Sequence, residues 1–144
     1  MNAIAAARAQ LEQASDLAGI LDAAYGAFEG MLPVIHGQED RAGGGFAAFV
    51  MSAASAANGR DAVAAAPSLP PAAPGRTPPA IAAPVTDVTE EEAAAVLAGL
   101  SQLLASRLAD AATWAADAAD RAACAVAARH AGAIWSLLAG APRA

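Results

Sequence analysis

The sequence is poor in the residue types from which most catalytic and binding sites are built. Among its 144 residues there are one cysteine, two histidines, one tyrosine, two tryptophans and no lysine. The lone cysteine, Cys124, excludes an intrachain disulfide and a zinc site made of several thiolates. All eight basic residues are arginines, dispersed along a chain of net charge −6. Because nucleic-acid binding needs clustered cations, we expect no nucleic-acid partner.

Long uninterrupted apolar runs are also scarce. Charged residues at positions 8, 12, 16 and 22 interrupt the N-terminal region, which excludes an ordinary signal peptide with a continuous apolar core. An uncharged run covers residues 42–59, but glycine, alanine, serine and asparagine dilute it, and this disfavours a membrane-spanning helix. We therefore expect a cytoplasmic protein with no membrane partner.

Alanine is what the chain does contain, at 48 of 144 residues. Alanine is the strongest helix former, whereas leucine, isoleucine, valine and phenylalanine together supply only 27 residues. We expect an all-α protein with thin cores and closely approaching helices, organised around the aromatic-rich stretch 25–61.

Residues 1–66 are predicted to form a helical hairpin. Its first helix should cover residues 3–32, because apolar residues repeat with coiled-coil spacing at Ile4, Leu11, Leu21 and Phe28, and Pro33 should end it. A connector over 34–45 should follow, and then a helix over 46–57 that ends at Asn58-Gly59. The predicted apolar face of that second helix is Phe46, Phe49, Val50, Ala53, Ala54 and Ala57.

Seven prolines in residues 67–84 indicate a Pro/Ala-rich linker, placed at 67–85. One long helix is predicted over 86–139, with Thr89 as its N-cap, followed by a tail over 140–144. An i,i+4 ion pair from Asp117 to Arg121 is expected on this helix. Either the helix breaks and packs back on the hairpin, or it projects and pairs with another chain.

Candidate catalytic and metal-binding groups are few. His36, Glu39 and Asp40 are the one compact set of metal-ligand types, and no second set at zinc or di-iron spacing accompanies them. No Gly-x-Ser-x-Gly elbow or phosphate-binding loop occurs. We expect no enzyme activity, no catalytic residue, no metal and no cofactor.

The predicted function is that of a non-enzymatic helical interaction or scaffold protein that associates with itself or with another helical protein. Tryptophans on a charged helix are typical of interfaces, and small residues allow close helix approach. The candidate interface residues are Trp114, Trp135, Ala111, Ala115, Ala118 and Ala122. Peripheral membrane attachment through 46–57 is a weaker alternative, because that helix lacks a basic face.

An alternative role comes from a resemblance. The pentapeptide from Tyr25 to Glu29 is similar to the Tyr-x-x-x-Asp/Glu motif in substrates of actinobacterial type VII secretion. Those substrates are helical hairpins, so the resemblance implies a small export substrate or secretion partner. The Trp-x-Gly turn of that family is missing here, and the tyrosine motif falls inside the first predicted helix. Tyr25 and Phe28 therefore also fit a purely structural role in the core.

Overall fold

The computed structural model describes residues 2–41, 45–71, 85 and 87–139, and the protein is all-α, as predicted. In the described part of the chain five helices follow one another: α1 (Asn2–Gln13), α2 (Leu17–Glu39), α3 (Phe46–Ala64), α4 (Glu90–Trp114) and α5 (Ala118–Ala139).

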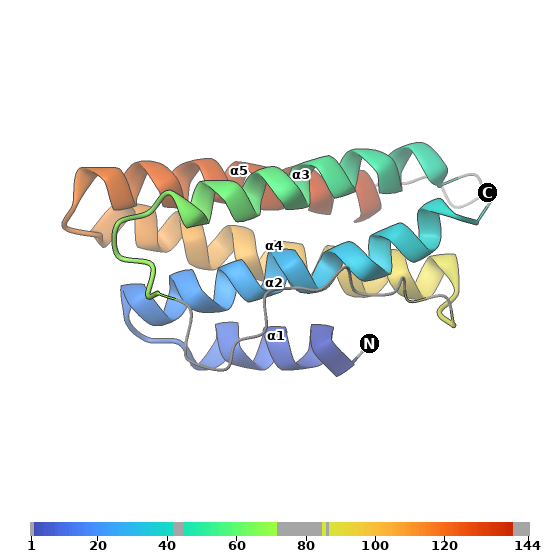
Figure 1. The fold of residues 1–144 in the computed structure, drawn as a ribbon, viewed down its shortest axis with the longest axis horizontal. Helices are drawn as coiled ribbons and strands as arrows, with labels where there is room; N and C mark the ends of the chain where they lie inside the picture. Colours follow the sequence, from blue (N-terminus) through green and yellow to red (C-terminus); the bar gives the residue numbers. More distant parts are fainter. Residues whose placement is uncertain (1, 42–44, 72–84, 86, 140–144) are drawn as a thin grey trace.

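Helices α2, α3, α5 and α4 form a four-helix bundle (Figure 1). α2 packs against α3 and α4, and α5 packs against the same two helices. Neighbouring helices run antiparallel, so the directions along the chain are up, down, down and up. α1 packs on α2 and α4, on the side of the bundle away from α3. This arrangement leaves one face of α3 without a helix to cover it.

The predicted single helix over 3–32 is wrong, because the chain breaks between Gln13 and Leu17. The Asp16 carboxylate caps the new helix by accepting a hydrogen bond from the Gly19 amide at 2.8 Å. On the other side of the break, the Arg107 guanidinium of α4 donates to the Ala14 carbonyl. Side chains therefore satisfy backbone groups at both new helix ends. Ile4 and Leu11 still face the core, but from a separate helix.

The predicted helix end at Pro33 is also wrong, because α2 continues to Glu39. Proline removes one hydrogen bond from a helix interior, but burial of Val34 and Ile35 favours continuation of the helix. The connector predicted over 34–45 is therefore reduced to residues 40–45, of which 42–44 lie outside the described residues.

The second helix was predicted to stop at Asn58-Gly59, but α3 continues to Ala64. Gly59 faces the ring of Phe28, and a Cβ added to it would be 2.5 Å from the ring atom Cε1. The glycine thus serves close packing of α3 on α2 and does not end the helix. The buried residues of α3 are Phe49, Ser52, Ala56, Gly59 and Val63. Of the predicted apolar face only Phe49 is fully buried, whereas Phe46, Val50 and Ala54 are exposed.

The long helix predicted over 86–139 forms two helices, α4 and α5, which pack against each other. Thr89 is the N-cap of α4, as predicted, and its hydroxyl accepts from the Glu92 amide. At the break, Asp117 accepts hydrogen bonds from the amides of Ala119 and Asp120, at 2.8 and 3.1 Å. Arg121 donates to the carbonyls of Ala115 and Ala116, so no Asp117–Arg121 ion pair forms.

Most of the predicted linker, residues 72–84, and the predicted tail, residues 140–144, lie outside the described part of the chain. The described start of the linker is anchored to α5, because Ser68 donates through its amide and its hydroxyl to the buried carboxylate of Asp120. The described end, Val85, lies against α2.

Two helices, α2 and α5, are long and apolar enough by composition to cross a membrane. Half of the apolar window of α2 and a third of that of α5 are buried inside the bundle. The core helices of a soluble protein have the same properties, so this observation does not by itself favour a membrane location.

Candidate interaction surface

The uncovered side of α3 carries exposed apolar side chains in its first turns. Phe46, Val50 and Met51 are 51%, 41% and 57% exposed. Ala47 and Ala54 share this side of the helix and are also exposed. These five residues are referred to below as the α3 apolar face. Between Phe46 and Gly59 the helix carries no charged residue.

The α3 apolar face arises from the packing register of the helix. Its small residues, Ser52, Ala56 and Gly59, point into the bundle and let α3 approach its neighbours closely. Phe46, Val50 and Met51 point outward, whereas Phe49 and Val63 lie on the buried side with the small residues. Sequence reasoning assigned Phe46 and Val50 to the buried side, and so missed this surface. The spacing of Ser52, Ala56 and Gly59, at intervals of four and three residues, is the signal that identifies the buried face.

Of the predicted alanine interface only part is accessible. Ala111 and Ala115 are buried, because they pack inside the bundle. Ala118 and Ala122 are exposed, since the break before α5 shifts the apolar register, and Ala123 and Ala127 are buried in their place. The four alanines therefore do not form one continuous surface.

Trp114 and Trp135 are 50% and 42% exposed. Trp114 is the last residue of α4, whereas Trp135 lies near the far end of α5, so the two rings are at opposite ends of the bundle (Figure 1). The C-terminal end of α5, which includes Trp135, lies at the end of the bundle where α3 begins (Figure 1). The tryptophans thus belong to separate places on the surface.

The predicted metal-ligand set lies on the last turn of α2 and in the residue that follows it. His36 and Asp40 are exposed and Glu39 is half-buried. Among the described residues, no three histidine, cysteine or acidic side chains lie close enough together to hold a metal ion. This part of the chain therefore provides no ready-made metal centre.

Two buried nucleophilic side chains, those of Ser101 and Cys124, have structural environments. The Ser101 hydroxyl donates to the Leu97 carbonyl of its own helix at 2.7 Å. Cys124 is fully buried, and its burial, together with the nearby Asp120 carboxylate, raises the pKa of the thiol from 9.0. A raised pKa keeps the thiol protonated and unreactive near neutral pH.

The arginines Arg41, Arg107 and Arg121 each donate to backbone carbonyls where one segment meets another. They stabilise the chain connections, and the described structure does not gather them into a cationic patch. Comparisons with known protein families, curated proteins and solved structures find no match.

Proposed function

We propose that this chain is a non-enzymatic helical interaction protein that associates with a second copy of itself through the α3 apolar face. The observation that carries the proposal is the group of Phe46, Val50 and Met51, exposed side by side on a helix that is uncharged over this length. A contiguous apolar patch exposed on a protein surface commonly marks a site of interaction with another molecule.

The face suits pairing about a two-fold axis. If two copies of α3 pack antiparallel with Val50 and Met51 near the axis, Phe46 of each copy lies opposite Ala54 of the other. Large side chains then meet small ones, which permits close packing of the two helices. An isologous contact of this kind closes as a dimer and does not propagate into a filament.

The salt dependence of association distinguishes the proposed apolar contact from one that is held by ion pairs. Each copy carries a net charge of −6, so two copies repel each other at low ionic strength. The α3 apolar face carries no charged residue, so the proposed contact has no ion pair of its own for salt to weaken. Added salt should therefore strengthen association, because it screens the repulsion between whole molecules.

Disulfide cross-linking gives a direct test of the two-fold geometry, because the chain has a single cysteine, Cys124, that can be removed. In a Cys124→Ala background, Val50→Cys places the thiols of two copies near the proposed axis. We expect mild oxidation to produce a covalent dimer in high yield. The matched control, Ala122→Cys on the exposed side of α5 in the same background, should remain largely monomeric. Equal cross-linking at both positions would contradict the proposed surface.

Attachment to a membrane is the alternative role for the α3 apolar face, and vesicle binding tests it. The α3 apolar face has no basic residue among its neighbours from Phe46 to Gly59, which disfavours binding to anionic lipid. We expect no co-sedimentation with vesicles of phosphatidylcholine or phosphatidylserine. Binding that Val50→Glu abolishes would replace the self-association proposal with a membrane one. The export role stays a prediction, and its test is whether neighbouring genes encode secretion machinery.

A further inference from the structure

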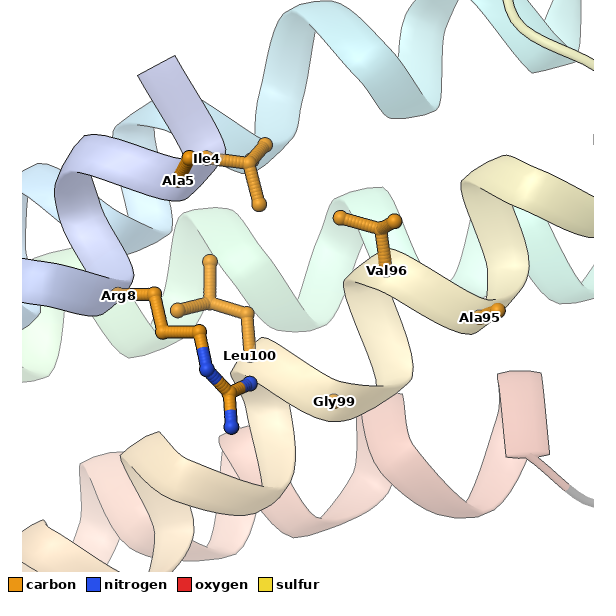
Figure 2. Close-up of a pocket in the computed structure, with 7 residues that line it drawn as sticks. All are labelled: Ile4, Ala5, Arg8, Ala95, Val96, Gly99 and Leu100. Atoms are coloured by element: carbon orange, nitrogen blue, oxygen red, sulfur yellow. The ribbon is translucent and has the colours of Figure 1, made fainter. Parts of the chain in front are cut away.

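A groove of about 370 Å³ lies between α1 and α4, on the side of the bundle away from α3 (Figure 2). Ile4 of α1 and Val96 of α4 point toward each other across it, and Leu100 contributes to its apolar lining. α4 has a glycine here, Gly99, which exposes helix backbone within the groove. The volume falls within the range of ~300–1,000 Å³ that is usual for small-molecule sites.

One charged side chain, Arg8, lines this groove. Its stem runs beside Leu100, and its guanidinium lies next to Gly99 (Figure 2). A Cβ added at Gly99 would be 3.4 Å from the Arg8 nitrogen Nη1. The Arg8 nitrogen Nε is paired with Glu12 at 3.0 Å, and about half of each side chain is exposed. No described residue accepts a hydrogen bond from the two terminal nitrogens of Arg8.

From this combination we infer that the α1–α4 groove binds an aliphatic carboxylate, with the alkyl chain along Ile4, Val96 and Leu100 and the carboxylate on Arg8. An apolar groove with a single cation fits a ligand that has an apolar chain and a single anionic end. The two free nitrogens of the guanidinium match the two oxygens of a carboxylate. A neutral or cationic head group cannot form that pair.

Glu12 limits the affinity, because its carboxylate competes with the ligand for Arg8. Replacement of Glu12 by glutamine removes the competing charge, so the groove should bind a carboxylate about twofold more tightly, as expected for a solvent-exposed pair. Loss of the guanidinium in Arg8→Met should weaken carboxylate binding about tenfold. These opposite effects distinguish a charge-specific site from general apolar adsorption.

The test uses the whole 144-residue chain and decanoate below its aggregation concentration, and binding is followed by amide chemical shifts and titration calorimetry. We expect shifts at Gly99 and Leu100, weaker binding in Arg8→Met and tighter binding in Glu12→Gln. Decanol, which has the same chain without the charge, should bind more weakly than decanoate and equally to wild type and Arg8→Met. Gly99→Met should block the groove, because Gly99 lines it. The fold should tolerate this change, since an added Cβ meets only the flexible end of Arg8.

Several results would overturn the assignment. These are the absence of shifts at Gly99 and Leu100 with millimolar decanoate, equal binding by wild type and Arg8→Met, or equal binding of decanol and decanoate. Circular dichroism of each variant verifies that the fold is retained. The site is independent of self-association, so Val50→Glu on α3 should bind decanoate as wild type does.

Discussion

Gly37 and Val85 are in such close contact that Gly37 has no room for a side chain. A Cβ on Gly37 would be 1.9 Å from the Val85 carbonyl oxygen, and the Val85 amide donates to the Pro33 carbonyl at 3.0 Å. Pro33 and Gly37 are one turn apart on α2, and Val85, in the chain that leads into α4, packs against both of them. Gln38 continues this contact by donating to the Val88 carbonyl at 3.0 Å.

Gly37→Ala should therefore destabilise the protein by about 2–3 kcal/mol, because the methyl group overlaps the Val85 backbone, which is hydrogen-bonded to Pro33. The matched control is Gly30→Ala on the same helix, where an added Cβ meets nothing within 4 Å. That variant should gain about 0.5–1 kcal/mol from helix propensity. Unfolding in urea, followed by circular dichroism, measures both changes. A Gly37→Ala variant as stable as wild type would contradict the close contact of Gly37 with Val85.

The contact of Gly59 with Phe28 predicts a second destabilising substitution. Gly59→Ala places a methyl group 2.5 Å from the Phe28 ring, and should cost about 1–3 kcal/mol. Gly132→Ala on α5, where the space is open, should be stabilising. In a Phe28→Leu background the penalty of Gly59→Ala should shrink, giving a coupling energy of about 1 kcal/mol or more in a double-mutant cycle. Strictly additive effects would show that the two residues do not press on each other.

The bonds from Ser68 to Asp120 predict that the segment after α3 stabilises the start of α5. Ser68→Ala removes the hydroxyl bond to a buried carboxylate, and we expect a loss of about 1–2 kcal/mol. Ser136→Ala, at an exposed serine of α5, should stay within about 0.5 kcal/mol of wild type. Thermal unfolding of the two variants makes the comparison, and equal midpoints would refute a stabilising role for Ser68.

Burial of Cys124 predicts how stability changes at alkaline pH. The pKa of the thiol is raised in the folded state by burial and by Asp120, above its ordinary value of 9.0. Below that value both states hold the proton and stability is unaffected. As pH rises further, the unfolded chain releases the proton first, so the free energy of unfolding falls until the folded thiol also ionises.

The measurement is the free energy of unfolding of wild type and Cys124→Ala between about pH 8 and pH 10. The difference between the two proteins should decrease as pH rises through this range. Subtracting the variant removes the contributions of all groups that the two proteins share. A difference that stays constant with pH would mean that the thiol ionises equally easily in both states.

Helix content was predictable from the sequence, whereas the helix boundaries were not. Alanine and the Thr89 cap indicated helices correctly, because intrinsic propensity and capping are local effects. Pro33 and Gly59 were misread as helix ends, because tertiary packing opposes the local preference at each site. Gly59 is required by contact with Phe28, which is 31 positions away in sequence and cannot be recognised from local spacing.

The two helix breaks were hidden for a different reason. Alanines fit either side of a helix and so conceal a change of apolar phase. They are Ala14 and Ala18 at the first break, and Ala115, Ala116, Ala118 and Ala119 at the second. Asp16 and Asp117 are good N-caps and were the available signals. Without the second break, Ala118 and Ala122 were predicted to share one interface with Ala111 and Ala115. The exposed face of α3 was missed because the largest apolar residues were assumed to point inward.

Self-association through the α3 apolar face sets the mass of the protein in solution, which light scattering coupled to gel filtration measures. At concentrations of tens of micromolar or more we predict a mass of twice 14.1 kDa for wild type. Val50→Glu should give a monomer, because a carboxylate buried in an apolar contact is strongly unfavourable. The control, Ala122→Glu on exposed α5, should stay dimeric. A wild-type mass of 14.1 kDa at every concentration, or a dimer that Ala122→Glu disrupts and Val50→Glu does not, would exclude self-association through this face.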